Sequence, residues 1–464
     1  MLFFRCFTVL LLMYFTYAAK ITFDQQVFHD EINELLNEVN IPGASVIAIN
    51  GSYPCYEDAF GLRSISPVIK NDLTSIFNLA SVSKTITGIV VMKLVEIGQL
   101  DLDQNINFYI DFYINNPTIN IVHPNYSNNS ITLRLLLTHY SSINTQFLPN
   151  IYFPFDNFTI NNPDYGNNYL GGFVLDYLLP SGKYYNESNW LPVPPGSEYS
   201  YSNVGIALVA WLCEVATGEY FYSLTNKYLF KPLGMSDATS WFLKSVPTDK
   251  QNLLMRHYIF NETNQTFFQN SFSHLSFNSF PDKDHPQINW TESEPYGYYI
   301  YPGGLLRSTI GDLAMHLSMF ITNGTYLNPI TNKSVEILKA STVAEMSRIQ
   351  YPQFKFPTGL IWTYYTLNVS RVRFLLGHTG SDIGVTTFMF FNPQTQIGVI
   401  LLTTGNVLST NDWQNDRIRN QLWLIMDKVF NAFESKPISD CSCRISSLVH
   451  WCATLFIIHL HKHS

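Results

Sequence analysis

The sequence predicts an α+β fold, an α/β sandwich in which one antiparallel sheet is assembled from both ends of the chain. Strand-like runs occur near the N-terminus and again in the C-terminal third, and helical periodicity dominates between them. One helix precedes the first strands and another follows the last. This order is typical of a single sheet that carries an inserted, mostly helical domain.

The N-terminal part begins with a helix. Apolar residues recur at helical spacing over residues 22–40, and Pro42 with Gly43 ends the pattern. Residues 44–49 predict a buried strand, and residues 55–62 a second strand after a turn.

The middle contains two helices that are apolar nearly all round, at residues 81–97 and 204–217, and such helices belong in the interior of a protein. Shorter helices are expected at residues 132–138, 172–178 and 220–230.

The C-terminal third predicts helices at 309–321 and 334–348, strands at 359–366, 371–378, 385–392 and 397–403, and a closing helix at 412–433. We therefore expect one domain over residues 20–436. Its sheet subdomain comprises about residues 20–75 and 300–434, and its helical subdomain about residues 76–299.

The composition excludes several classes of protein. Of 464 residues, 46% are hydrophobic and 13% are charged, so the chain can bury a large core and is not disordered throughout. The net charge is -8 without a basic patch, which argues against nucleic acid as a partner.

The N-terminus predicts a signal peptide at residues 1–19. Arg5 precedes the apolar run 7–17, and small residues follow the run. An uncleaved membrane anchor is the alternative, although the run is shorter than the roughly 20 residues of a membrane span. Glycosylation sequons, which have meaning only in a lumenal or extracellular chain, agree with secretion. They begin at Asn50, Asn125, Asn128, Asn157, Asn186, Asn261, Asn264, Asn289, Asn323, Asn332 and Asn368.

Residues 437–464 form a separate tail, in which cysteines and small residues precede the apolar run 448–460. A glycolipid-anchor signal, a short acylated membrane helix, and no membrane attachment are the alternatives. In the body of the chain, Cys213 lies in an apolar run and is expected to be a buried thiol rather than a bridge partner.

Three short motifs carry candidate chemistry. Ser81 and Lys84 are three residues apart at the start of the first interior helix, Tyr201 and Asn203 begin the second, and His378-Thr379-Gly380 ends a predicted strand. Each motif alone is common, and each residue has an ordinary structural role open to it, such as helix capping by Ser81. Their joint occurrence in this order is far more specific.

With these motifs the sequence resembles the class C β-lactamase and D-alanyl-D-alanine carboxypeptidase branch of the penicillin-binding superfamily. It most resembles the β-lactamase-related serine hydrolases and esterases in which His replaces the Lys of the third motif. Further matches are Leu136-Leu137-Thr138-His139, Pro195-Gly196, Pro232-Leu233-Gly234-Met235 and Pro302-Gly303-Gly304-Leu305. The resemblance spans about residues 23–431 and implies a β-lactamase/transpeptidase-like fold.

The candidate catalytic residues are Ser81, Lys84 and Tyr201. Ser81 is a weak nucleophile unless a base accepts its proton. Lys84 can do so only when neutral, and burial in an apolar helix would lower its pKa. A phenol beside the amine could share one proton with it, so the division of work between Lys84 and Tyr201 stays open.

The resemblance assigns substrate-binding positions to Asn203, His378, Gly380 and Ser381. It implies that Tyr201 protonates the leaving group and then activates the deacylating water. The backbone N–H groups of Ser81 and Ser381 would hold the oxyanion. Asn203 would bond the substrate amide and Lys84, and Gly380 would allow close approach of a strand edge.

The sequence departs from the family pattern at two places. Family members continue Thr-His with Thr-Ser-Gly, whereas this chain has Tyr140-Ser141-Ser142, so this loop is expected to sit differently. His378 replaces the cation that usually meets a β-lactam carboxylate, which weakens any claim to β-lactamase activity.

We therefore predict a serine hydrolase that acts through an acyl-enzyme on an ester, amide or peptide bond. The partner is a small-molecule or peptide substrate, without metal or organic cofactor, and the oligomeric state is not predicted. The alternatives are a catalytically silent binding glycoprotein on the same fold and a true β-lactamase or carboxypeptidase. Aromatic-rich stretches at 143–195 and 248–295, including Trp290 and Tyr298, are expected to form loops that roof the pocket.

Overall fold

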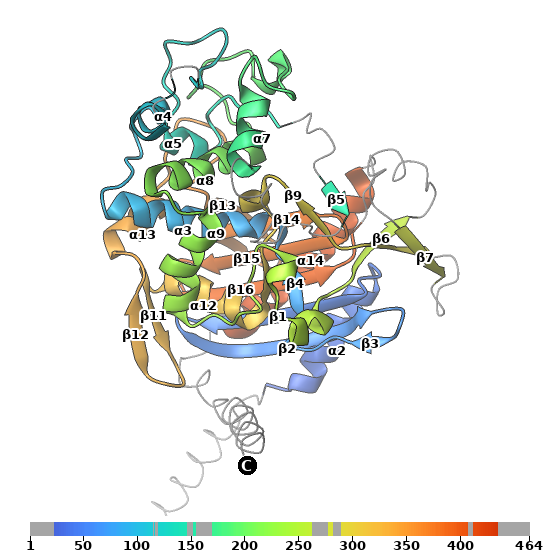
Figure 1. Cartoon of the computed structure of the whole chain (residues 1–464). Coiled ribbons are helices and arrows are strands. Elements are labelled where there is room, and N and C mark those ends of the chain that lie inside the picture. The colour runs from blue at the N-terminus through green and yellow to red at the C-terminus, as the bar shows by residue number, and fades with distance from the viewer. Residues whose placement is uncertain are drawn as a thin grey trace, which may run out of the picture.

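The computed structural model describes residues 23–114, 116, 119–145, 152–154, 169–261, 277–281, 289–406 and 412–434. The predicted signal peptide and the predicted C-terminal tail lie outside these residues. A central sheet is packed between two helical layers, and the larger helical layer extends above it in Figure 1.

The central sheet joins the two ends of the chain. Its seven strands are antiparallel in the order β13-β14-β15-β16-β1-β2-β3. They are β1 (Gly43–Asn50), β2 (Tyr53–Ser64), β3 (Ile69–Lys70), β13 (Thr363–Asn368), β14 (Val372–Asp382), β15 (Val385–Asn392) and β16 (Ile397–Thr404). Strand β16 pairs with β1 along its whole length, from Thr404 opposite Gly43 to Ile397 opposite Asn50. The predicted fold class is confirmed, while the subdomain boundaries stay a prediction.

The central strands are buried on both faces, which explains why their sequences are continuous apolar runs rather than alternating patterns. Every residue of β1 and β16 is buried. In β1, Val46 and Ala48 belong to one hydrophobic cluster, and Ile47 and Ile49 belong to the other. Successive side chains therefore enter the two cores in turn, as the pleat of a strand requires.

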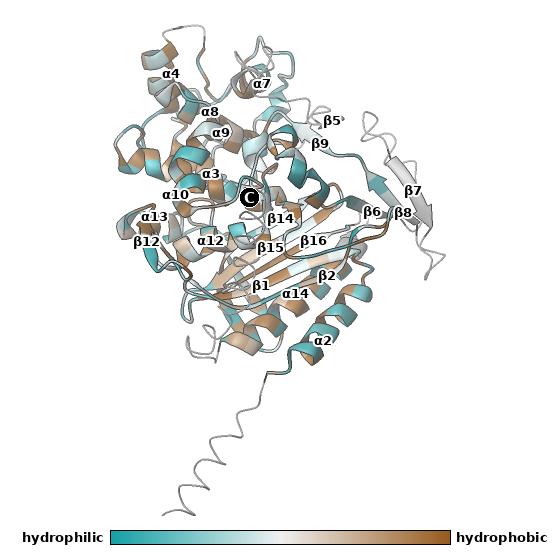
Figure 2. Ribbon diagram, turned by 60° about the horizontal axis from the view of Figure 1, so that its bottom comes forward, coloured by the Kyte–Doolittle hydropathy of each residue, from teal (hydrophilic) through white to brown (hydrophobic). Residues whose placement is uncertain are grey.

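One face of the sheet is covered by the helices from the two chain ends, α2 (Gln25–Asn37) and α14 (Asp412–Phe433). Figure 2 shows them side by side beneath the sheet, each with its apolar stripe turned inward. Helix α2 begins after Asp24, whose carboxylate accepts backbone N–H groups of the first turn.

The other face carries the helical part of the molecule. Its helices are α3 (Ser83–Glu96), α4 (Ile106–Ile114), α5 (Leu133–Leu137), α7 (Tyr169–Leu178), α8 (Asn203–Thr217), α9 (Phe221–Thr225), α10 (Lys231–Leu233), α12 (Ile310–Ile321) and α13 (Ala340–Ser347). Helices α3 and α8 are buried along nearly their whole lengths, as their sequences predict.

Some predictions of secondary structure are wrong. Residues 334–348 do not form one helix, because β11 (Thr325–Asn328) and β12 (Lys333–Glu336) make a hairpin and α13 begins only at Ala340. Asn332 has a φ of 53° in the turn, a conformation that Asn tolerates well. No element was predicted at helix α4, which is a short apolar run that periodicity alone cannot assign.

The stretch expected to be loops at 248–295 contains a three-stranded sheet. Its strands are β6 (His257–Asn261), β7 (Phe277–Pro281) and β8 (Asn289–Ser293), in the order β6-β8-β7. Strand β6 pairs with β8 across a wide sequence separation, so no short turn between them signals the pairing. Two smaller antiparallel pairs join β4 (Ile76–Asn78) to β10 (Arg307–Thr309) and β5 (Tyr152–Pro154) to β9 (Tyr296–Tyr298).

The two described cysteines differ. Cys213 is buried and free, as predicted, whereas Cys55 is disulfide-bonded. Across the described residues, no single helix has both the length and the apolar composition of a membrane span; the bent pair Asn203–Thr217 and Phe221–Leu233 has them only when its two helices are combined.

A buried ion cluster fixes α14 to the sheet. Arg373 on β14 lies 2.5 Å from Asp427 and 2.8 Å from Glu434, and its side chain is 2% exposed. Arg371, two residues earlier, also contacts Glu434, but its side chain is 53% exposed. The two arginines therefore bind the same carboxylate from a buried and an exposed position.

Replacing Arg373 with Ala is expected to lower the free energy of unfolding by about 3 to 5 kcal/mol, because two buried carboxylates lose their cation. Arg371→Ala is the matched control and should cost about 1 kcal/mol or less, as exposed ion pairs do. Urea unfolding of both variants measures the difference. Equal losses in the two variants would show that burial of the cluster does not matter.

Candidate active site

Ser81 lies on a tight turn rather than within the helix that follows. The 3₁₀ turn η1 (Ala80–Val82) connects β4 to α3, and the α-helix begins only at Ser83. Ala80 has a φ of 45°, a strained conformation for a residue with a side chain, and its N–H donates to Asn78 Oδ1 at 2.9 Å. Among the described residues, the Ser81 N–H donates to no protein acceptor. It is thus available to a ligand.

Lys84 reaches back to Ser81 from the first turn of α3. Its Nζ lies 3.0 Å from Ser81 Oγ and also donates to the carbonyl of Gly303. The lysine is fully buried. Burial lowers its pKa from 10.5 to about 7, although the charge of Asp382 acts in the opposite direction. A substantial fraction of this amine is therefore neutral at physiological pH.

Tyr201 covers the same amine. Lys84 Nζ lies 4.9 Å from the centroid of the Tyr201 ring. Burial of the hydroxyl end raises the pKa of the phenol, and a side-chain interaction with Ser81 opposes the shift, while 37% of the residue stays exposed. The phenol is accordingly protonated when the amine is neutral.

His139 holds the segment that carries Tyr201. Its carbonyl accepts the Ser200 N–H at 2.8 Å and its Nδ1 accepts the Ser202 N–H at 3.1 Å, so it binds the chain on both sides of Tyr201. The two rings lie 4.5 Å apart. Burial, followed by the charges of Lys84 and His378, lowers the His139 pKa well below its usual value. Because Ser202 is the N-cap residue of α8, His139 also satisfies the start of that helix.

Asn203 lies beside the amine without bonding to it. A Cβ atom on Gly303 would lie 3.6 Å from Asn203 Oδ1 and 3.7 Å from Lys84 Nζ, so both groups face this glycine. Asn203 Oδ1 is buried and has no hydrogen-bond partner. The hydrogen bond to Lys84 that the resemblance implies is therefore absent among the described contacts, and the oxygen remains available for a ligand N–H.

The third motif forms the opposite wall. Strand β14 extends through Gly380 to Asp382, beyond its predicted end at residue 378. A Cβ atom on Gly380 would lie 2.7 Å from Leu79 O and 3.0 Å from Ala80 Cβ, so this glycine allows β14 to pack against the Ser81 turn. The sequence predicted that Gly380 would allow close approach to the substrate; in the structure it allows close approach to the Ser81 turn. Ser381 follows Gly380 and is exposed.

His378 is buried beside Tyr201, with ring centroids 6.3 Å apart. Burial and then the charge of Lys84 lower its pKa to about 4, although a contact with the Thr379 carbonyl opposes the shift. The imidazole is therefore neutral at pH 7 and supplies no positive charge where the family's lysine stands.

A pocket of about 470 Å³ continues from this wall along β14. Strand β13 pairs with β14 only as far as Thr363 opposite Gly377, so residues 378–382 have no strand partner on that edge among the described residues. Beyond them the pocket is lined by aromatic rings and one cation: Tyr365, Phe388, Phe390, Trp423 and Arg419. The Tyr365 and Trp423 rings are stacked at 4.1 Å.

Sequence reasoning missed this aromatic wall. Tyr365 and Trp423 come from β13 and α14, and nothing in their spacing distinguishes them from core residues. Tyr298, which was expected to roof the pocket, instead donates to Asp382 at 3.2 Å and is 6% exposed, so it supports the third motif from within. The side chain of Trp290 lies outside the described residues. No cluster of metal-binding side chains was found within the described part of the chain.

Comparisons with known proteins agree with this geometry. The Beta-lactamase family model matches residues 28–421. Protein flp of Staphylococcus aureus strain N315 is 22% identical over 390 residues, which cover 84% of this chain and 65% of that protein. The chain thus spans slightly less than two thirds of that relative. The D-alanyl-D-alanine-carboxypeptidase/endopeptidase AmpH of Escherichia coli K12 is 22% identical over 85% of this chain and 86% of its own length.

Solved structures show the same fold. The D-amino acid amidase of Ochrobactrum anthropi SV3, complexed with D-phenylalanine, superposes with a TM-score of 0.61 at 17% identity, over 87% of this chain and 99% of the amidase. A class C beta-lactamase superposes with a TM-score of 0.59 at 18% identity, over 90% of this chain and 99% of its own. Because the family match covers most of the chain and the fold agrees, this protein belongs to the beta-lactamase family of serine hydrolases.

Proposed function

We propose that the protein hydrolyses ester or amide bonds through an acyl-enzyme on Ser81. The observation that carries this proposal is the 3.0 Å contact between Ser81 Oγ and the buried amine of Lys84, whose pKa lies at about 7. A neutral amine at this distance can accept the hydroxyl proton as the oxygen attacks. The raised pKa of Tyr201 keeps the phenol protonated, which makes Lys84 the base in the free enzyme.

The reaction follows from these positions. Ser81 Oγ attacks the carbonyl carbon, its proton passes to Lys84, and the Ser81 N–H with the Ser381 N–H stabilises the oxyanion. When the tetrahedral intermediate collapses, the bond to the leaving alcohol or amine breaks and Tyr201 donates a proton to it, regaining one from Lys84. In the second half, water attacks the acyl carbon and gives a proton to Tyr201 while Tyr201 passes its own proton to Lys84; the second tetrahedral intermediate then collapses, and Ser81 leaves with the proton returned from Lys84.

The substrate preference that we propose follows from the pocket beside the site. An apolar or aromatic group suits the wall formed by Tyr365 and Trp423. A neutral His378 offers no cation for a β-lactam carboxylate, so β-lactams should be poor substrates. The predicted signal peptide and the sequons suggest that the reaction takes place outside the cell or in a lumen.

Labelling with a fluorophosphonate, which reacts with activated serines, tests the proposal that the protein is a serine hydrolase. The native protein should be labelled and Ser81→Ala should not. Ser381→Ala is the matched control: it keeps the backbone N–H that we assign to the oxyanion hole, so it should still be labelled. An unlabelled native protein would leave the silent binding glycoprotein as the better account.

The labelling rate should depend on pH through Lys84. Because only the neutral amine accepts a proton, the rate should fall about tenfold per pH unit well below pH 7 and level off above it. Lys84→Met should lower the rate by about 10² to 10⁴ and abolish this dependence. A native profile that is flat between pH 5 and 8 would contradict the assignment of Lys84 as base.

The same shift makes Lys84 destabilising at neutral pH. Its folded pKa of about 7 lies below the usual 10.5, so folding disfavours the protonated form and stability is lost as the pH falls from about 10.5 to about 7. Lys84→Met should therefore be more stable than the native protein at pH 7, by up to about 5 kcal/mol. Thermal unfolding of both proteins from pH 6 to 10 should show this advantage shrinking as the pH rises.

The aromatic wall is tested by the discrimination between two esters. In Tyr365→Ala, the ratio of kcat/KM for p-nitrophenyl phenylacetate over p-nitrophenyl acetate should fall by up to about tenfold, the value of a lost ring stack. Tyr364 is the matched control, since it lies on the same strand but turns to the other face and donates to Ser347 O. Tyr364→Ala should leave the ratio unchanged, and equal effects in both variants would refute the assignment.

A further inference from the structure

Two tyrosine hydroxyls on β9 connect β4 to the end of β14. The Tyr296 hydroxyl accepts the Asn78 amide at 3.2 Å and donates to the Ile383 carbonyl at 3.4 Å. The Tyr298 hydroxyl donates to Asp382 Oδ2 at 3.2 Å. The proposed reaction gives no part to these tyrosines or to Asp382.

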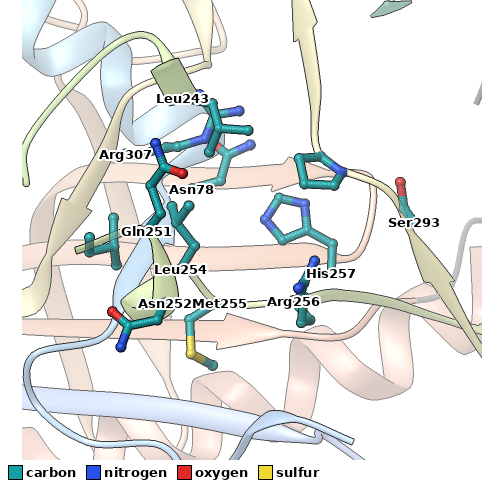
Figure 3. Close-up of a pocket in the computed structure, with 12 residues that line it drawn as sticks. Asn78, Leu243, Gln251, Asn252, Leu254, Met255, Arg256, His257, Ser293 and Arg307 are labelled. Carbon is teal, nitrogen blue, oxygen red and sulfur yellow. The ribbon is translucent and has the colours of Figure 1, made fainter. Parts of the chain in front are cut away.

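A buried arginine fixes the backbone of β9. Arg307, which lines the pocket of Figure 3 beside Asn78, is 3% exposed and donates to the Tyr296 carbonyl at 2.7 Å. Arg307 and Asn78 also face each other where β10 pairs with β4. Strand β9 is therefore tied to β10 and, through it, to the strand that leads into the Ser81 turn.

The Tyr298 hydroxyl reaches the turn that binds the Lys84 amine. A Cβ atom on Gly304 would overlap this hydroxyl, so the glycine leaves room for it. The preceding residue, Gly303, supplies the carbonyl to which Lys84 Nζ donates. The same hydroxyl thus contacts Asp382 and the turn that receives the amine.

The Asp382 carboxylate is fixed at the end of β14. Its Oδ1 accepts the Ile383 N–H at 2.8 Å, and its Oδ2 accepts the Tyr298 hydroxyl. The side-chain amide of Asn406, which is 4% exposed, donates to the Asp382 carbonyl and, at 3.1 Å, to the Val385 carbonyl. Asp382 and Val385 pair where β14 turns into β15. Because both the backbone and the side chain are held, the charge of Asp382 has a defined position.

This charge acts on the buried amine. Burial lowers the pKa of Lys84 to about 7, and the negative charge of Asp382 opposes that shift. Tyr201, His139 and His378 also interact with the amine. All three are neutral at pH 7, because burial raises the pKa of the phenol and lowers the pKa of each imidazole. Asp382 therefore supplies a negative charge where these neighbours supply none.

A general base works best when it is neutral at the working pH and still binds a proton strongly. Burial alone would make the Lys84 amine a weaker base. We propose that Asp382 is a positioning residue of the reaction, with a carboxylate that keeps the Lys84 amine a strong enough base at neutral pH. Tyr298 holds this carboxylate in place. The inference rests on the proposed function, in which Lys84 activates Ser81.

Asp382→Asn removes the charge and keeps the shape of the side chain. The Lys84 amine should then lose its proton more easily, so the midpoint of the pH profile of fluorophosphonate labelling should fall by about one pH unit. The weaker base should also lower the plateau rate. Tyr298→Phe should move the midpoint in the same direction by less. It should add no shift in the Asp382→Asn background, because the tyrosine acts through the carboxylate.

Asp58→Asn is the matched control. Asp58 also accepts a tyrosine hydroxyl, from Tyr56 at 3.0 Å, but it lies on β2 and contacts His29 of α2. Its replacement removes a carboxylate of the same kind on the side of the sheet away from Lys84. The labelling midpoint should therefore stay at its native value.

A second measurement does not require a reactive serine. Lys84→Met should be more stable than the native protein, and the pH above which this advantage declines marks the folded pKa of Lys84. In the Asp382→Asn background, this pH should be lower by about one pH unit. Far-UV circular dichroism confirms that each variant is folded, and Asp382→Ser takes the place of Asp382→Asn if the latter does not fold.

The two measurements separate the inference from the proposed function. The inference is overturned if Asp382→Asn leaves the labelling midpoint or the pH of the stability decline at its native value, or if Asp58→Asn shifts the midpoint equally. An unlabelled native protein would instead refute the proposed hydrolase, and the stability measurement would still decide whether Asp382 acts on Lys84.

Discussion

Burial of the Lys84 amine is the constraint on which the rest of the site depends. A buried amine tends to lose its proton because the charged form is poorly solvated. The fold can bury Lys84 because Gly303 O and Ser81 Oγ accept hydrogen bonds from its Nζ. That placement requires α3 to lie in the interior between the sheet and α8, which explains a helix that is apolar nearly all round. The interior position of α3 is therefore required by Lys84 as well as by the hydrophobic residues of the helix.

Much of the fold follows from local sequence patterns because the patterns extend over whole elements. β1 and β16 are eight-residue apolar runs, and α14 spans the residues that its periodicity predicts. The errors occur where the pattern is short or the pairing is distant. Strands β6 and β8 pair across a long intervening segment. Strands β11 and β12 are so short that their residues fit a helical pattern equally well, and the turn at Asn332 between them is not evident from the sequence.

The site divides in the same way. Ser81, Lys84, Tyr201, Asn203 and the third motif could be named from the sequence because they lie in recognisable motifs, and the structure brings them together. How they are held could not be predicted. Long-range contacts hold them: Ala80 is strained, His139 bonds the chain on both sides of Tyr201, and Gly380 packs against the Ser81 turn. The aromatic wall of Tyr365 and Trp423 gave no local signal either.

The turn that carries Ser81 is supported from two sides. On the β14 side, Gly380 packs against Leu79 and Ala80, and Thr387 donates to Leu79 O at 2.9 Å, so this contact is dry and close. On the β4 side, Asn78 accepts the Ala80 N–H at 2.9 Å and donates to the Tyr296 hydroxyl at 3.2 Å. The strained conformation of Ala80 is therefore held from two different strands, as a backbone strain that persists in a folded protein requires. The position of Ser81 thus depends on contacts from β4 and β14 that lie far apart in the sequence.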